Sequence, residues 1–130
     1  MERALKGFTT VIQHRPYNAD AYYNRGVAYG EQGEEECAIA DCDKAIDLKP
    51  DYAEPYNIRG VAYRDIGNYD RAFSAFNTAI QLKPDYIDAY NNRGIAYFNK
   101  GDFDRVIAEY DTVIQLKPDY VEAFYNRGIA

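Results

Sequence analysis

The sequence predicts an all-α protein, an α-solenoid of antiparallel helix pairs, and three observations lead to this prediction. The motif Asn-Arg-Gly-Ile-Ala-Tyr at residues 92–97 returns in closely similar form at 24–29, 58–63 and 126–130, so its copies are evenly spaced along the chain. Two further sets of residues keep this spacing, namely Pro16, Pro50, Pro84 and Pro118, and Gly33, Gly67 and Gly101. Three markers in one register indicate a repeat array, in which each unit buries its apolar face against its neighbours.

The first predicted element is an amphipathic helix over residues 1–15. Its apolar residues recur at helical spacing, and they are Ala4, Leu5, Phe8, Val11 and Ile12. Pro16 ends this helix, because a proline disfavours the helical conformation in the residue before it.

The next residues define the repeating unit. A helix is predicted over 20–32, Gly33 follows at a C-cap position, a second helix covers 34–48, and Pro50 closes the unit. The unit is complete at 19–52, 53–86 and 87–120. The chain is therefore predicted as a single array over 1–130, with the second helix of a partial repeat at 1–16 and the first helix of another at 121–130.

Small residues mark the expected crossing point within each helix pair. In the middle unit Gly60 lies on the first helix and Ala72 on the second, and this pairing lets the two backbones approach closely. The large side chains of Tyr56 and Phe76 lie four residues away and are expected to fill the space on either side.

Charge and composition restrict the class of partner. The chain has 21 Asp and Glu against 15 Lys and Arg, a net charge of -6, which argues against nucleic acid and favours a neutral or basic partner. No apolar run approaches the length of a membrane span, so no membrane contact is expected. Cys37 and Cys42 are five residues apart and point in different directions on a helix, so free thiols and a cytoplasmic location are expected.

The residues that carry catalysis in enzymes are not assembled in this sequence. The single histidine, His14, lies at the end of a helix in line with Leu48 and Leu82, a packing position. No serine has a plausible base, no glycine-rich loop follows a strand, and no cluster has metal-ligand spacing. The sequence therefore predicts a protein that is not an enzyme, with no catalytic residue, metal site or cofactor.

These residues resemble the tetratricopeptide repeat, a helix–turn–helix unit of about 34 residues. The family's aromatic, small, aromatic, alanine, aromatic and proline positions match Tyr56, Gly60, Tyr63, Ala72, Phe76 and Pro84. The next copy matches with Tyr90, Gly94, Tyr97, Tyr110 and Pro118, although Val106 replaces the alanine. The first copy matches with Tyr22, Gly26, Tyr29, Ala38 and Pro50, although Cys42 replaces the aromatic residue.

Two departures from the family pattern are informative. Tyr or Phe replaces the family's usual tryptophan throughout. The leucine that usually precedes the glycine is replaced by an arginine, at Arg25, Arg59, Arg93 and Arg127. The chain is thus similar to the Asn-Arg-Gly form of the repeat, of the bacterial and archaeal type. Either the arginine stems pack between helices while the guanidinium groups find a carboxylate or carbonyl, or the arginines form a basic row that faces a ligand.

The resemblance implies a protein-interaction scaffold that winds into a right-handed superhelix. The first helix of each pair would line its concave face, where a peptide or partner segment binds. The residues that the resemblance places on this face are Asp20, Tyr23, Asn24, Glu54, Asn57, Arg64, Asp88, Asn91, Asn92, Phe98, Glu122, Tyr125 and Asn126.

The residue types on this face suggest how it would bind. An asparagine at Asn24, Asn92 and Asn126, interrupted by Ile58, offers a donor and an acceptor to a peptide backbone. The acidic row beside it favours Lys or Arg in the ligand, and aromatic residues supply anchors. Alternatively, asparagine is only tolerated on an exposed face, and the acids stabilise each helix start through the helix dipole.

The pattern also bears on two other functions. One branch of the family clamps the C-terminal carboxylate of chaperone tails with cations, but Asp88, Glu122 and Val61 depart from that pattern. The other function is self-assembly, because the half units at 1–16 and 121–130 would continue the superhelix if copies stacked head to tail, forming a homo-oligomer.

Overall fold

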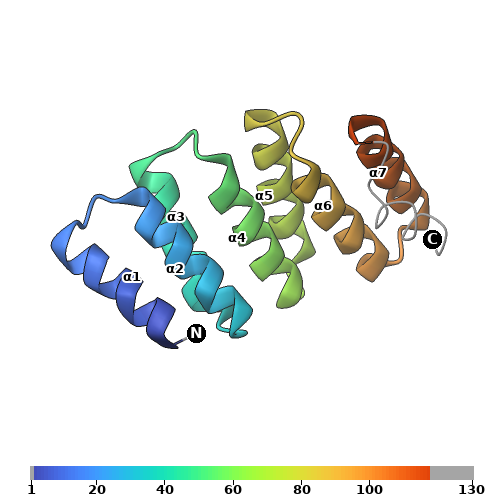
Figure 1. Ribbon diagram of the computed structural model, residues 1–130. Helices are drawn as coiled ribbons and strands as arrows, with labels where there is room; N and C mark the ends of the chain where they lie inside the picture. The colour runs from blue at the N-terminus through green and yellow to red at the C-terminus, as the bar shows by residue number, and fades with distance from the viewer. Residues whose placement is uncertain (1, 118–130) are drawn as a thin grey trace.

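The computed structural model describes residues 2–117, with side chains from Leu5 onward. This part of the chain folds into seven α-helices: α1 (Glu2–His14), α2 (Ala19–Glu31), α3 (Glu35–Leu48), α4 (Ala53–Asp65), α5 (Tyr69–Leu82), α6 (Ile87–Lys100) and α7 (Phe103–Leu116). Figure 1 shows them following one another from α1 to α7, with α3 behind α2. The predicted all-α solenoid is confirmed, and the helices begin and end within one or two residues of the expected positions.

Consecutive helices pack against each other from α1 to α7, which makes the pairs α2–α3, α4–α5 and α6–α7. The first helices of these pairs also touch, α2 against α4 and α4 against α6. Because α2, α4 and α6 are one repeat apart, their equivalent residues form rows across a common surface, which we call the α2–α4–α6 face (Figure 1).

The turns within each pair explain why the helices stop where they do. Gly33, Gly67 and Gly101 adopt φ angles of 78°, 84° and 86°, in the left-handed region that only glycine enters without strain. Side chains then cap the helices that follow two of these turns. Asn68 Oδ1 accepts from the backbone N–H of Arg71 at 3.3 Å, and Asp102 Oδ1 accepts from that of Arg105 at 3.4 Å.

Each glycine lies at the close approach within its helix pair, as predicted, but Phe76 and not Ala72 stands opposite Gly60. Gly60 faces Phe76, whose ring is fully buried, and a Cβ atom on Gly60 would lie 2.5 Å from Phe76 Cε1. Gly26 and Gly94 face Cys42 and Tyr110, where the nearest atom of these side chains would lie 3.2 Å from an added Cβ. The aromatic ring of the middle pair therefore occupies the space that a side chain at residue 60 would need.

We expect Gly60→Ala to destabilise the fold by roughly 1–3 kcal/mol, because the buried Phe76 ring must shift to admit the methyl group. Urea denaturation measures this free energy of unfolding. The control is Gly7→Ala on α1, where an added Cβ has nothing within 4 Å and should raise stability by roughly 0.5–1 kcal/mol. A Gly60→Ala protein as stable as its parent would contradict the close approach of α4 and α5.

The two cysteines are free and have opposite environments. Cys37 is exposed, whereas Cys42 is fully buried at the crossing with Gly26. Burial, followed by the negative charges of Asp41 and Asp43, raises the pKa of the Cys42 thiol from its ordinary value of 9.0 to about 12. The folded protein therefore holds this thiol proton more tightly than the unfolded chain does.

This difference makes stability depend on pH. The thiol contributes fully below pH 9, where both states are protonated, and its contribution is lost as the pH rises toward 12. We expect the free energy of unfolding to fall by at most about 1.4 kcal/mol per pH unit above pH 9.

Urea titrations between pH 8 and 10 test this dependence, and Tyr23, Tyr52 and Tyr86 add a slope of the same sign toward pH 10, because their ordinary pKa is 10.0 and the folded protein raises it. Cys42→Ala should therefore reduce the slope, most clearly below about pH 9.5, and Cys37→Ala should leave it unchanged. An equal slope in parent and Cys42→Ala proteins would show that the thiol is not its source.

Candidate functional site

Acidic and tyrosine side chains meet where α2, α4 and α6 begin. Asp20, Glu54 and Asp88 lie in the first turns of these three helices. Tyr23 follows Asp20 on α2, and Tyr52 and Tyr86 occupy the N-cap positions of α4 and α6. The rings of Tyr23 and Tyr52 are 5.4 Å apart between centroids. We call these six residues the acid–tyrosine cluster.

Electrostatic effects show that the members of this cluster act on one another. Burial and then the charge of Glu54 raise the pKa of Tyr23. Burial and then hydrogen bonding to Asp20 raise the pKa of Tyr52. Burial raises the pKa of Tyr86, with further contributions from Tyr23, Glu54 and Asp88. The hydroxyls therefore stay neutral beside three carboxylates, and the cluster has a net negative charge at neutral pH.

The asparagines of the predicted site divide into two kinds. Asn24 on α2 is exposed, as a ligand contact requires. Asn57 and Asn91 are only 4% and 8% exposed, and the Nδ2 group of Asn92 donates to Asn57 Oδ1 at 3.0 Å. The contact between Asn92 and Asn57 joins α4 to α6, so a continuous row of free amides is not presented in this conformation.

The remaining predicted residues lie farther along the helices. Arg64 is half-buried, and its Nη1 donates to the backbone oxygen of Asn92 at 3.2 Å. Phe98 is 43% exposed and packs edge-on against Phe103 at 5.5 Å between ring centroids. The last three predicted site residues, Glu122, Tyr125 and Asn126, lie outside the described residues.

An apolar pocket of about 250 Å³ opens between α2, α3 and α4. Its lining residues are Val27, Gly30, Glu31, Glu35, Ala38, Ile58, Val61 and Ala62. Tyr23, Val27 and Glu31 follow one another at intervals of four, so the pocket lies on the same side of α2 as the acid–tyrosine cluster. Burial, with the charge of Asp65, raises the pKa of Glu35 at its edge, although Arg64 opposes this effect.

The repeat explains why this pocket exists. Gly30 corresponds to Arg64 in the second copy and to Phe98 in the third. In the second copy the Arg64 side chain reaches across to α6, whereas Gly30 leaves the equivalent space beside α4 open. A comparison of the residue types at this position in the three repeats is the sequence signal that could have predicted the pocket.

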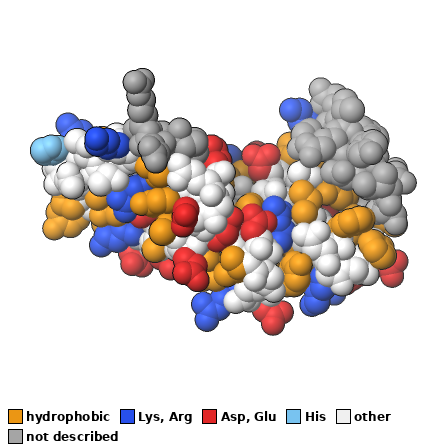
Figure 2. Space-filling view, turned by 90° about the horizontal axis from the view of Figure 1, so that it is seen from below, with side chains coloured by type: hydrophobic (Ala, Val, Ile, Leu, Met, Phe, Trp, Pro, Cys, Tyr) orange, Lys and Arg blue, Asp and Glu red, His pale blue; other side chains and the backbone are white. Residues whose placement is uncertain are grey.

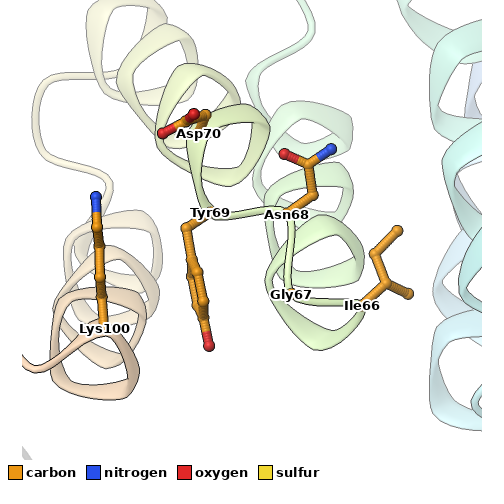
Figure 3. Close-up of a pocket in the computed structure, with 6 residues that line it drawn as sticks. All are labelled: Ile66, Gly67, Asn68, Tyr69, Asp70 and Lys100. Carbon is orange, nitrogen blue, oxygen red and sulfur yellow. The ribbon is translucent and has the colours of Figure 1, made fainter.

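A second pocket, of about 490 Å³, lies at the turn between α4 and α5. Figure 3 shows Tyr69 and Asp70 at the start of α5 and Lys100 of α6 around it, with the turn residues on the other side. Figure 2 looks onto this edge of the molecule, where acidic, basic and apolar side chains are mixed. With one lysine and one aspartate, the pocket favours neither sign of charge.

The arginine row is structural in the first and third copies. Arg25 donates through Nε and Nη2 to Asp41 at 2.7 Å in both cases, and through Nη1 to Thr9 at 3.3 Å. Arg93 donates to Glu109 at 2.8 and 2.9 Å, and to Asn77 at 2.6 Å. Each arginine thus joins the second helix of its own repeat to the second helix of the preceding repeat. This agrees with the interpretation in which the arginines pack between helices and bind a carboxylate.

Two members of the acid–tyrosine cluster were not predicted from the sequence. Tyr52 and Tyr86 follow the proline turns at Pro50 and Pro84, whereas the predicted face included only residues within the first helices. Their equivalent positions in successive copies put them in one row, and this is the signal that could have identified them.

Among residues 2–117, no group of three or more His, Cys, Asp or Glu side chains is arranged to hold a metal ion. None of helices α1 to α7 combines the length and apolar character that a membrane span requires.

The fold is shared with several solved structures. MamA is 30% identical and superposes with a TM-score of 0.85, covering 96% of this chain and 73% of MamA. The first TPR of Spaghetti (RPAP3), bound to the HSP90 peptide SRMEEVD, is 28% identical with a TM-score of 0.78, covering 84% of this chain and 86% of that one. TTC0263, a TPR protein of Thermus thermophilus, has a TM-score of 0.87 at 21% identity, covering 96% of this chain and 70% of that one.

No curated protein matches this chain. Two family profiles do match: the tetratricopeptide repeat over residues 19–52, and the TPR repeat over residues 60–101 and 96–130. These segments together cover most of the sequence. The chain therefore belongs to the tetratricopeptide repeat family.

Proposed function

We propose that this chain is a protein-interaction scaffold whose α2–α4–α6 face binds an extended, neutral to basic segment of a partner protein. The acid–tyrosine cluster is the observation that supports this proposal. Its carboxylates come from three successive repeats, so a ligand that runs across the helices meets one of them at each step. No catalytic role is part of the proposal.

The chemistry of the cluster favours Lys and Arg side chains. A carboxylate attracts the cationic head, and a tyrosine ring accepts its flat or methylene surface through cation–π and apolar contact. The protein's own lysines already make this ring contact at two members of the cluster, since Lys49 Nζ lies 4.9 Å from the Tyr52 ring centroid and Lys83 Nζ lies 4.8 Å from that of Tyr86. A ligand cation would therefore use the Tyr23 ring and the carboxylates, or displace one of these lysines. Asn24 adds an exposed amide for the ligand backbone.

Related structures support peptide binding but not the same ligand charge. RPAP3 binds the HSP90 peptide SRMEEVD, in which acidic residues outnumber the single arginine. An acidic ligand of that kind would meet Asp20, Glu54 and Asp88 here, and like charges repel. We therefore propose a ligand of the opposite charge.

Head-to-tail self-assembly is a weaker alternative. It depends on residues 121–130, which lie outside the described residues, and no contact among residues 2–117 favours it.

The proposal is tested by fluorescence anisotropy with a labelled peptide of alternating Lys and Ser. We expect Asp20→Asn/Asp88→Asn to weaken binding about three- to tenfold, because each exposed charge contact contributes about 0.2–1 kcal/mol. Raising the salt concentration should reduce the difference between parent and variant, since these charges are accessible to solvent.

Asp70→Asn/Asp104→Asn is a matched control. These aspartates are also exposed and lie in the first turns of α5 and α7, so the charge change and its effect on the helix dipole are matched. A peptide of alternating Glu and Ser should not bind. Equal losses in the two double variants would show that only overall charge matters and would contradict a site on the α2–α4–α6 face.

The apolar pocket next to the cluster gives a second prediction. We expect Gly30→Leu to fill the pocket and to weaken binding of a Lys/Ser peptide that carries one central Leu by roughly tenfold. The Cβ atom of the new side chain has room, because the nearest atom to it is Ala38 Cβ at 4.0 Å, and the pocket offers space for the rest. Isothermal titration calorimetry of the Leu peptide and of the same peptide with Ser at that place measures the effect.

Gly7→Leu on α1 serves as the control for adding a leucine to an open helix surface. Binding of the Ser peptide should be the same in all three proteins. If the Leu and Ser peptides bind the parent equally well, the pocket does not contact the ligand.

A further inference from the structure

The second repeat breaks the pattern of arginine pairing. In the first and third copies the partner carboxylate stands 16 residues after the arginine, at Asp41 and Glu109. The equivalent residue for Arg59 is Ala75, which is buried and has no acceptor on its side chain. Arg59 therefore keeps only the hydrogen bond to the second helix of the preceding repeat, α3, where its Nη1 donates to Asp43 at 2.8 Å.

The missing carboxylate leaves donors of Arg59 unused. Its Nε is buried and has no acceptor among the described residues. In Arg25 and Arg93 the Nε and Nη2 groups together form the fork that holds a carboxylate. A buried donor without an acceptor is unfavourable, so an external acceptor at this place gains more than one at an ordinary surface arginine.

A pocket of about 230 Å³ opens at Arg59, and its other lining residues are Tyr63, Arg71 and Ser74. We call it the Arg59 pocket. Arg71 Nη1 lies 3.4 Å from the Tyr63 hydroxyl and donates to it, which holds a second guanidinium at the pocket. Ser74 adds a hydroxyl where the other two copies have Ala40 and Ala108. The second copy thus loses an acidic residue and gains a polar one at adjacent positions.

We propose that the Arg59 pocket binds a carboxylate, supplied by an Asp or Glu side chain of a partner protein. The bound carboxylate would take the place that Asp41 and Glu109 fill in the neighbouring copies, accepting from the Arg59 fork. Arg71 would contribute a second positive charge beside Arg59, whose Nη1 is paired with Asp43. Charge-assisted hydrogen bonds from two guanidinium groups are the strongest that side chains offer to such a ligand.

This site is separate from the proposed peptide site. Its lining residues come from α4 and α5, and none of them belongs to the acid–tyrosine cluster or to the apolar pocket. The two proposals can therefore fail independently, since one expects a basic ligand and the other an acidic one.

Nuclear magnetic resonance of the arginine Nε–H groups tests the proposal directly. The probes are the blocked tripeptide acetyl-Gly-Glu-Gly-amide, its Gln counterpart and inorganic phosphate, compared at equal ionic strength. We expect the Arg59 Nε–H signal to move saturably with the Glu peptide and not with the Gln peptide. The Arg25 and Arg93 signals should stay in place, because their forks are already occupied.

Two variants support the assignment. Ala75→Asp restores the internal carboxylate and should abolish the shift. If that variant does not fold, Arg71→Gln at the exposed edge should weaken Glu-peptide binding by roughly tenfold. Its matched control is Arg105→Gln, because Arg105 makes the same 3.4 Å contact with Tyr97 in the third copy.

Three results would overturn the proposal. The first is an Arg59 signal that does not respond to the Glu peptide, or that responds equally to the Gln peptide. The second is an equal loss of binding in Arg71→Gln and Arg105→Gln. The third is phosphate binding at least about tenfold more tightly than the Glu peptide, which would identify a phosphate site instead.

Discussion

The arginine that precedes the glycine in each repeat ties the array together. Arg25 connects α1, α2 and α3 through Thr9 and Asp41, and Arg93 connects α5, α6 and α7 through Asn77 and Glu109. The guanidinium groups are mostly removed from solvent, with side chains 19% and 18% exposed. Apolar packing is not directional, whereas a bidentate ion pair between arginine and carboxylate fixes the position of one helix along the other.

That constraint, with the close crossing at Gly60, determines how the α2–α4–α6 face is presented. The second helices hold each first helix at one height and rotation, so equivalent residues fall into rows. The three acidic residues of the acid–tyrosine cluster lie near one another for this reason, although each belongs to a different repeat. The amide contact between Asn92 and Asn57 joins α6 to α4 and so fixes the distance between two of these rows.

Most of the fold could be predicted from the sequence, and less of the candidate site. Proline and glycine at fixed spacing locate every turn, because their backbone preferences act locally. The acidic row also followed from the repeat. The burial of Asn57 and Asn91 did not, because it depends on the rotation of one helix pair against the next, which no local signal encodes. The sequence left two interpretations of the arginine row open, and the structure decided between them by showing that Asp41 and Glu109 on the second helices bind the arginines of the first and third copies. The second copy has no carboxylate at the equivalent position.

The buried thiol of Cys42 can be used to measure local opening of the helices around it. A thiol reagent in solvent has direct access to the exposed Cys37, but reaches Cys42 only when the helices packed around it, α2 and α4 included, move away from α3. The ratio of the two reaction rates thus reports how often the packing around α3 opens. No added label is needed, because the sulfur of Cys42 already stands where the second and third copies have the rings of Phe76 and Tyr110.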